Sequence, residues 1–227
     1  MSMRSALEQV RAADVELGRT DPIPFALPAR GLEAVITGGF LGMERSDWIF
    51  PGLRERTGAV LRGCPVERLR DGHAGARPYR IAPVTTSAGA RMLQACGLAA
   101  GGEGSVLCFI GQGSAATGSF HEALNLAALR SLPVVFLCHA WDLSAPDSPL
   151  PPQVAGSLSA KAVAFGIQAR TVDGGLITEV LSAVSEARAQ GGPAFIEARL
   201  TRGDDPISRA WDELTETDPA ASEAATA

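Results

Sequence analysis

Residues 104–138 read GSVLCFIGQGSAATGSFHEALNLAALRSLPVVFLC, and this stretch decides the fold. The run 104–111 is apolar and closed by glycine, which is typical of a strand buried on both faces. Ser119 and Glu122 have the spacing of a capping box, and the apolar residues after them repeat at intervals of three and four, which predicts a helix. The run 133–138 predicts the next strand. A strand, a helix and a second strand in this order indicate a parallel sheet.

The same alternation continues toward the C-terminus. It predicts a helix over 159–165, a strand within 167–175, a helix over 177–187 and a final strand over 193–200. We therefore expect an α/β fold with a doubly wound, mostly parallel sheet and helices on both faces.

The first hundred residues are less periodic, and they predict helices over 5–17, 32–43 and 52–62. Residues 1–65 are interpreted as a helical N-terminal lead-in that belongs to the same domain as the α/β part, residues 66–212. The run 71–86 has turn residues and no sustained period, which indicates a loop near the site or a docking surface. Residues 213–227 are mostly small and acidic, and we expect a disordered tail there.

Composition limits the possible partners. The chain has 227 residues, 46% of them apolar, and 20 basic residues against 25 acidic ones give a net charge of −5. Such a chain has no basic field for a phosphate backbone, so we expect no nucleic acid among its partners. No apolar run approaches the roughly 20 residues of a membrane span, so we expect no membrane partner either. The four cysteines form no Cys-x-x-Cys pair, which favours reduced thiols and a cytoplasmic location.

The glycine loop 111–118 is the first place to look for a ligand. In open α/β sheets ligands bind at the carboxyl ends of the strands, and this loop follows the first core strand. Its small residues expose backbone N–H groups next to the start of a helix, a combination that suits an anion such as a phosphate. The spacing alone is equally compatible with a tight connection that binds nothing.

Residues 111–138 resemble the cofactor signature of the alpha subunit of thiamine-diphosphate-dependent two-oxoacid dehydrogenases of the pyruvate and branched-chain type. In that signature a Gly-Asp-Gly loop, a Phe-His-Glu-Ala-x-Asn helix and a Leu-Pro-apolar strand lead to a pair of asparagines. The resemblance continues in the same order from residue 30 to residue 202, through the segments 30–35, 47–63, 87–101, 161–174 and 191–203.

The resemblance implies a cofactor and a partner. It implies thiamine diphosphate, bound through magnesium at an interface with a beta-type subunit in an α2β2 complex. The implied reaction is decarboxylation of a 2-oxoacid followed by acyl or ketol transfer, with a lipoyl group or another carrier protein as the acyl acceptor. The family's activating carboxylate belongs to the beta chain, so this chain alone should be inactive. The cofactor-binding positions that it implies are Arg54, Gly111, Gln112, Gly113, Ser114 and Trp141.

Several positions depart from the family pattern. The metal-binding Asp falls on Gln112 and the metal-binding Asn falls on Trp141. Magnesium favours hard oxygen ligands that usually include a carboxylate, whereas an amide oxygen is neutral and an indole offers no oxygen. We therefore expect a degenerate magnesium site that is atypical or lost. The Tyr of the family's Tyr-Arg pair is Leu53, and the loop 203–208 lacks the family's histidine.

Two histidines are candidates for catalysis. His121 follows the predicted helix start, where local hydrogen bonds would equally explain it. His139 follows the second core strand, so we expect its side chain near the glycine loop. His139 and Asp142 together are a candidate replacement for the lost metal ligands. Trp141 could instead fill the space that a metal and a diphosphate would take.

Two further hypotheses compete with the enzyme subunit. The chain could be a non-catalytic binding subunit that keeps the fold and the interface but has lost the cofactor. It could also be an NAD-binding oxidoreductase, because residues 111–116 match the pattern G-x-G-x-x-A. That pattern normally follows the first strand of its domain, and the acidic residue expected about 20 positions later is absent here.

Overall fold

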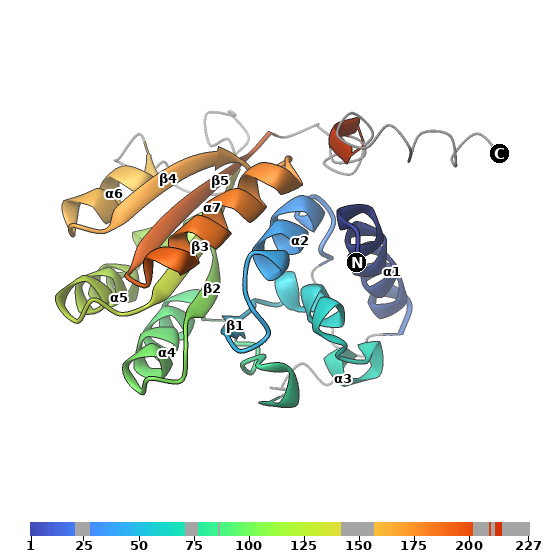
Figure 1. Cartoon of the computed structure of the whole chain (residues 1–227), viewed down its shortest axis with the longest axis horizontal. Helices are drawn as coiled ribbons and strands as arrows, with labels where there is room; N and C mark the ends of the chain where they lie inside the picture. Colours follow the sequence, from blue (N-terminus) through green and yellow to red (C-terminus); the bar gives the residue numbers. More distant parts are fainter. Residues whose placement is uncertain are drawn as a thin grey trace.

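Five parallel strands form the centre of the molecule (Figure 1). The computed structural model describes residues 1–20, 28–70, 77–85, 87–141, 157–201, 209 and 212–214. In these residues the order across the sheet is β1-β2-β3-β5-β4. The strands are β1 (Trp48–Phe50), β2 (Val106–Gly111), β3 (Val134–Trp141), β4 (Gln168–Asp173) and β5 (Ala194–Leu200). The predicted parallel α/β sheet is confirmed.

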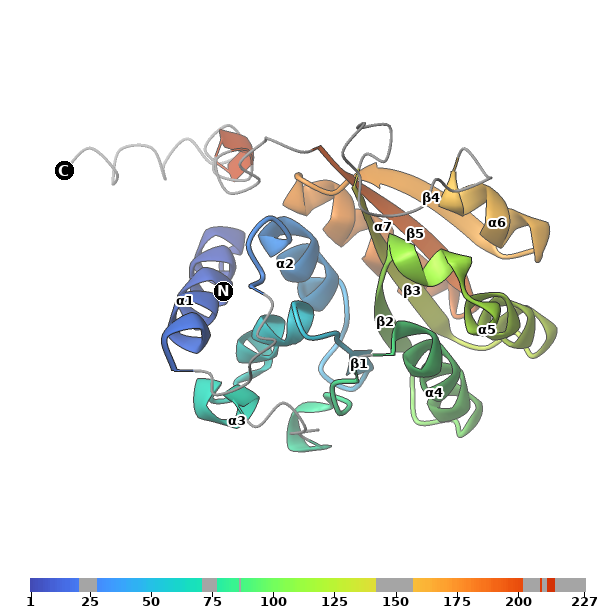
Figure 2. The same ribbon diagram turned by 180° about the vertical axis from the view of Figure 1, so that it is seen from behind.

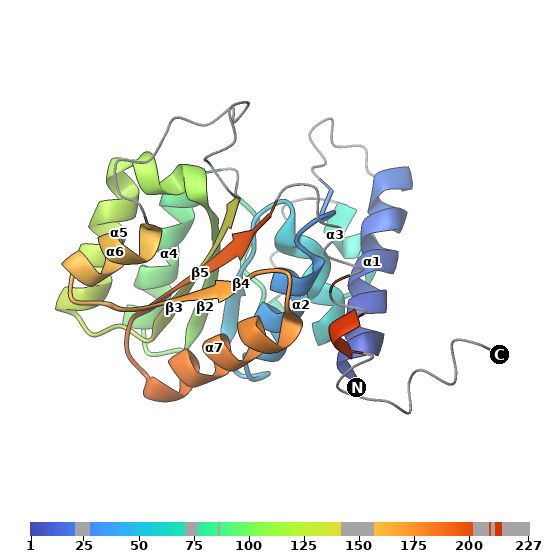
Figure 3. The ribbon, with the colours of Figure 1, turned by 90° about the horizontal axis from the view of Figure 1, so that it is seen from above.

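Helices cover both faces of this sheet, as the sequence predicts. Figure 1 is seen from the side of α2 (Glu33–Leu41) and α7 (Ile177–Gln190), and Figure 2 shows the opposite side. That opposite side carries α4 (Ala88–Ala100), α5 (Gly118–Leu129) and α6 (Leu158–Ala164). Seen from above, the two helix layers lie on opposite sides of the strands (Figure 3).

The apolar run of β2 explains why it lies inside. Leu107 and Phe109 pack on the α2–α7 side, while Cys108 and Ile110 pack on the α4–α5–α6 side, and all four are fully buried. Successive side chains of a strand point to opposite faces, so a strand covered on both sides has to be apolar at every position.

The N-terminal part is helical, but it also supplies a strand. It contains α1 (Met3–Thr20), the 3₁₀ helix η1 (Glu55–Arg62), α3 (Val66–Arg70) and the short 3₁₀ turn η2 (Arg77–Tyr79). The helix predicted over 52–62 therefore begins later and is a 3₁₀ helix. Residues 48–50 pair with β2 as an edge strand that the sequence analysis missed. The strand ends before Pro51, which has no N–H to donate.

Two details at helix ends differ from expectation. The start of α5 is capped by Thr117, whose hydroxyl accepts a hydrogen bond from the Phe120 N–H at 3.3 Å. The predicted capping box of Ser119 and Glu122 is wrong, because both residues lie inside the helix and the Glu122 side chain is exposed. No helix in the described ranges has both the length and the apolar character needed to cross a membrane.

The first residues of the predicted tail are packed against the fold. The Glu213 carboxylate accepts hydrogen bonds from the backbone N–H groups of Ile177 at 2.8 Å and Thr178 at 3.1 Å, so it caps α7. Leu214 is buried against Leu7 and Ala34. The ordered part of the chain therefore extends past the predicted boundary at 213, and residues 215–227 lie outside the described residues.

Candidate functional site

A pocket of about 220 Å³ opens at the carboxyl ends of β2 and β3. Its walls come from four separate parts of the chain: residues 52–55, Thr85 with Ala88 and Arg91 of α4, the glycine loop with Gly111, Gly113 and Ser114, and His139 of β3. The parallel register places Gly111 directly opposite His139, which brings the glycine loop and this histidine together as the sequence predicts.

A buried pair of a histidine and a carboxylate forms one wall of this pocket. The His139 Nε2 atom lies 2.8 Å from the Glu55 Oε1 atom, and the other carboxylate oxygen of Glu55 accepts a hydrogen bond from the Gly52 N–H at 2.9 Å. Only 4% of the Glu55 side chain is exposed. Burial by itself raises the pKa of Glu55, but the hydrogen bond from His139, its charge and the charge of Arg91 outweigh burial and hold this pKa at about 2. Glu55 is therefore ionised at neutral pH.

Arg91 supplies a second buried charge. Its Nη1 donates to the Phe109 carbonyl at 2.8 Å and its Nη2 to the Thr85 carbonyl at 3.3 Å. The Arg91 Nε and the His139 Nδ1 are both buried and have no hydrogen-bond partner within the described part of the chain. Buried polar atoms normally have partners, so two unpaired nitrogens on residues that line the pocket distinguish this region from an ordinary protein interior.

The glycine loop forms the 3₁₀ helix η3 (Gln112–Ala116) between β2 and α5. A Cβ atom on Gly111 would lie 3.1 Å from the His139 Cε1, so any larger residue here would press against the histidine ring. Lys161, the only lysine of the chain, donates to the Ala115 carbonyl at 2.8 Å and holds the end of η3.

Gln112 and Trp141 lie next to each other, and both make contacts with other residues of the chain. The Gln112 side-chain oxygen accepts a hydrogen bond from the Trp141 backbone N–H. The Trp141 indole lies over Gly31, where an added Cβ would come within 2.9 Å of the ring. These are the two positions at which the family resemblance places metal ligands.

The other candidate residues from the sequence do not all lie at this pocket. Arg54 lines the pocket, but its Nε and Nη2 donate to the Pro28 carbonyl at 2.9 Å and the Arg30 carbonyl at 2.7 Å. His121 has its Nδ1 3.0 Å from the Thr117 carbonyl, which is the local contact considered above, and it is absent from the pocket wall. Asp142 and the loop 203–208 lie outside the described residues.

The sequence analysis missed Glu55 and Arg91. A signal existed for Arg91, because it is the only charged residue in the small-residue segment 87–101. An arginine in such a helix needs a buried acceptor. Glu55 gave no such signal, since its partner lies 84 positions later in the chain.

The metal ion does not fit this site. Among the residues that the structure describes, no group of three or more His, Cys, Asp and Glu side chains is arranged to hold one. The Gln112 oxygen is neutral and already engaged by Trp141, and the indole offers no ligand atom. An anionic group fits better, because Arg91, His139 and the glycine loop line the pocket.

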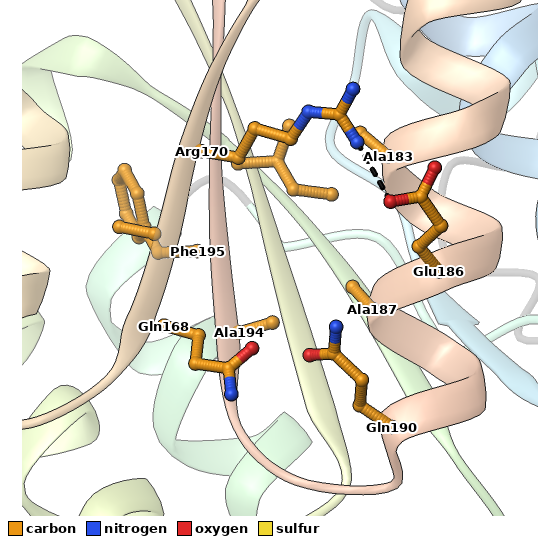
Figure 4. Close-up of a pocket in the computed structure, with 10 residues that line it drawn as sticks. Gln168, Arg170, Ala183, Glu186, Ala187, Gln190, Ala194 and Phe195 are labelled. Carbon is orange, nitrogen blue, oxygen red and sulfur yellow. Dashed lines mark hydrogen bonds and ion pairs between the residues drawn. The ribbon is translucent and has the colours of Figure 1, made fainter.

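A second hollow, of about 260 Å³, lies between α7 and the strands β4 and β5 (Figure 4). Its polar groups are the amides of Gln168 and Gln190 and an ion pair, Arg170 Nη1 to Glu186 Oε2 at 2.9 Å. About half of each side chain in this pair is exposed. The hollow is at the amino ends of the strands, away from the glycine loop, and it has no buried charge, so the smaller pocket is the better candidate.

Comparison with known proteins agrees with the resemblance read from the sequence. The family model described as "Dehydrogenase E1 component" matches residues 1–205. The 3-methyl-2-oxobutanoate dehydrogenase subunit alpha of Mycobacterium tuberculosis is 33% identical over 222 residues, covering 85% of this chain and 58% of the relative. The 2-oxoisovalerate dehydrogenase subunit alpha of Bacillus subtilis is 31% identical, with 88% and 71% covered. The pyruvate dehydrogenase E1 component subunit alpha of Staphylococcus aureus is 29% identical, with 85% and 58% covered.

A solved structure from Mycobacterium smegmatis supports the fold. It is described as a candidate thiamin diphosphate-dependent enzyme, and it matches 75% of this chain and 32% of its own length with a TM-score of 0.53 and 21% identity. This chain spans about three fifths of the length of two of the curated relatives. The matches fit the enzyme-subunit hypothesis and give no support to the non-catalytic or NAD-binding alternatives.

Proposed function

Because the chain belongs to the dehydrogenase E1 component family, we propose that it is an alpha-type subunit of a thiamine-diphosphate-dependent two-oxoacid dehydrogenase-like complex. A beta-type partner in an α2β2 assembly would complete the site, and the complex would decarboxylate a 2-oxoacid and pass its acyl or ketol unit to a lipoyl or other carrier. The observation that carries this proposal is the pocket beside the glycine loop, which lies where doubly wound sheets bind ligands and which contains the Glu55–His139 pair.

The pocket residues suit the phosphate end of such a cofactor. Arg91, which lines the pocket, contributes a buried positive charge that suits an anion. Gly111 and Gly113 let a ligand approach the backbone closely, since neither carries a side chain. Thiamine diphosphate, when bound, supplies the electron sink for decarboxylation. The chain itself binds and orients this group.

Glu55 fixes the role of His139. An imidazole that faces a carboxylate through Nε2 carries its proton there, so Nδ1 is left as a proton acceptor in the neutral ring and as a donor in the charged ring. The pair therefore positions one nitrogen in the pocket wall for a proton or an anionic oxygen. Magnesium has no part in this proposed arrangement, because the two positions at which the resemblance places its ligands are Gln112 and Trp141, and neither offers a carboxylate.

The proposal is tested by co-expressing the chain with a beta-type subunit and titrating thiamine diphosphate into the purified complex by calorimetry. We expect saturable binding that is at least about tenfold tighter than for thiamine without its phosphates. The complex should reduce ferricyanide in the presence of a 2-oxoacid, and the chain alone should not. A stable complex that binds no thiamine diphosphate refutes the proposal, and binding of NAD in its place would favour the dinucleotide hypothesis.

Two arginine substitutions, one in the pocket and one outside it, serve as test and control in this assay. Arg54→Ala removes a positive charge from the pocket wall and should weaken thiamine diphosphate binding at least about tenfold. Arg130→Ala removes an exposed arginine at the end of α5 and should leave the affinity unchanged. Equal effects of the two substitutions would show that the pocket is not where the cofactor binds.

A further inference from the structure

The side chains at the predicted metal and diphosphate positions bind the chain's own backbone. The Gln112 oxygen accepts the Trp141 N–H, which ties the start of η3 to the end of β3. The Arg54 guanidinium donates to two carbonyl groups of the segment 28–31, which precedes α2. The side chains of Gln112 and Arg54 therefore both have partners inside the molecule.

The same segment 28–31 is held from two further sides. The Gly31 N–H donates to the Glu33 carboxylate at 2.7 Å, and the Trp141 indole lies on Gly31. Gly31 has a φ of +87°, and an added Cβ would lie 2.9 Å from the indole Cη2 and 3.4 Å from Cζ2. This close approach needs glycine both for the backbone conformation and for the space.

We propose that Gln112, Trp141, Arg54 and the segment 28–31 form an edge clamp that replaces the divalent cation at the strand ends. This inference concerns the site of the proposed function and rests on it for the identity of the ligand. The clamp joins the ends of β2 and β3 to the segment before α2. Contacts within the chain therefore hold these three parts together without a metal. The neighbouring pocket then takes its anionic ligand independently of any divalent cation.

Physical chemistry supports the replacement. Magnesium needs near-octahedral coordination by oxygen atoms about 2.0–2.1 Å away. Here one ligand position offers a single amide oxygen that already accepts a hydrogen bond, and the other offers an aromatic ring. A cation at this place would have to break the Gln112–Trp141 hydrogen bond and displace the indole from Gly31, and it would gain no carboxylate ligand from either position.

A double-mutant cycle on Gly31 and Trp141 tests the clamp in the full chain. Gly31→Ala should lower the melting temperature by about 2–4 °C, because the new methyl group meets the indole and φ is positive. Trp141→Ala removes the ring, so the double variant should lose clearly less than the two single losses added together. Gly97→Ala is the control, since nothing lies within 4 Å of the added Cβ and the residue is helical. Additive losses would overturn the packing on which the clamp depends.

Binding experiments with Mn²⁺ and magnesium test whether the clamp replaces the metal. We expect no saturable Mn²⁺ binding to the wild-type chain by electron paramagnetic resonance of free Mn²⁺. In the complex with the beta-type partner, the dissociation constant of thiamine diphosphate should stay within about twofold when magnesium is replaced by EDTA. Saturable Mn²⁺ binding that Gln112→Ala abolishes, or a tightening of about tenfold or more by magnesium, would overturn the inference.

The two proposals can fail separately. If the complex binds no thiamine diphosphate, the proposed function fails, while the mutant cycle and the Mn²⁺ titration still decide the clamp. If thiamine diphosphate binds only with magnesium, the function stands and the clamp is refuted as a replacement for the metal.

Discussion

Replacing Glu55 by glutamine should cost stability in a pH-dependent way. Glu55 is fully buried, and its carboxylate is paired with His139 and bonded to the Gly52 N–H. A carboxyl group with an ordinary pKa of 4.5 that is held at about 2 in the folded chain contributes about 3 kcal/mol when ionised, because one pKa unit is worth about 1.4 kcal/mol. Glu55→Gln removes this charge and leaves the Gly52 N–H facing an amide that must also serve His139.

The direction of the pH effect follows from the lowered pKa. Because the pKa of Glu55 is lower in the folded chain than in the unfolded chain, its stabilisation is complete above pH 4.5 and is lost as the pH falls toward about 2. The difference in unfolding free energy between wild type and Glu55→Gln should therefore be about 3 kcal/mol at pH 7. Below pH 4.5 it should shrink by up to about 1.4 kcal/mol for each pH unit.

Urea unfolding followed by circular dichroism at about pH 7, 5.5, 4.5 and 3.5 measures this difference over the first part of the expected loss. Glu122→Gln, on the exposed face of α5, is the matched control and should change the unfolding free energy by no more than about 0.5 kcal/mol at any of them. A variant as stable as wild type at pH 7, or a loss that is the same at pH 7 and pH 3.5, refutes the reasoning, since both results would mean that the carboxylate is not stabilised by its neighbours.

Two further substitutions and one thiol reagent test the site and the core. Gly111→Ala places a methyl group 3.1 Å from the His139 ring, and it should weaken thiamine diphosphate binding to the complex at least about tenfold in calorimetry. Lys161→Met removes the hydrogen bond to the Ala115 carbonyl, and it should lower the unfolding free energy by about 1–2 kcal/mol in urea. Burial raises the pKa of Cys108 to about 12, so a thiol reagent at neutral pH should label the four buried cysteines only after denaturation; rapid labelling of the folded chain would contradict the burial.

The strands that carry the site could be predicted because their composition leaves little choice. β2 and β3 are apolar along nearly their whole length, and only a strand covered on both faces requires that. β1 could not be predicted in the same way. It has three residues and ends at Pro51, so no periodicity exists to detect, and its position follows only from pairing with β2.

Some contacts within the site could be predicted from the strand topology, and others could not. Adjacent parallel strands end at the same edge, so the neighbourhood of Gln112 and Trp141 follows from topology once the two strands are placed. The Glu55–His139 pair joins a 3₁₀ helix to a strand 84 positions away, and no local rule connects them. The cap of α5 shows the limit of local rules as well, because Thr117 and Ser119 are both suitable capping residues and the path of the preceding η3 selects the first.

The balance of charges in the pocket leads to a prediction about the proposed beta-type partner. Of the described residues that line it, Arg54 and Arg91 are positive and Glu55 is negative, which leaves one net positive charge before His139 is counted. A diphosphate group carries several negative charges, and the edge clamp excludes the divalent cation that would otherwise balance them. Under the proposed function, the isolated chain should therefore bind thiamine diphosphate much more weakly than the complex, because the proposed beta-type partner would supply further positive groups or shield the pocket from water. Calorimetry on the chain alone and on the complex measures this, and equal affinities would mean that the chain's own residues already balance the ligand.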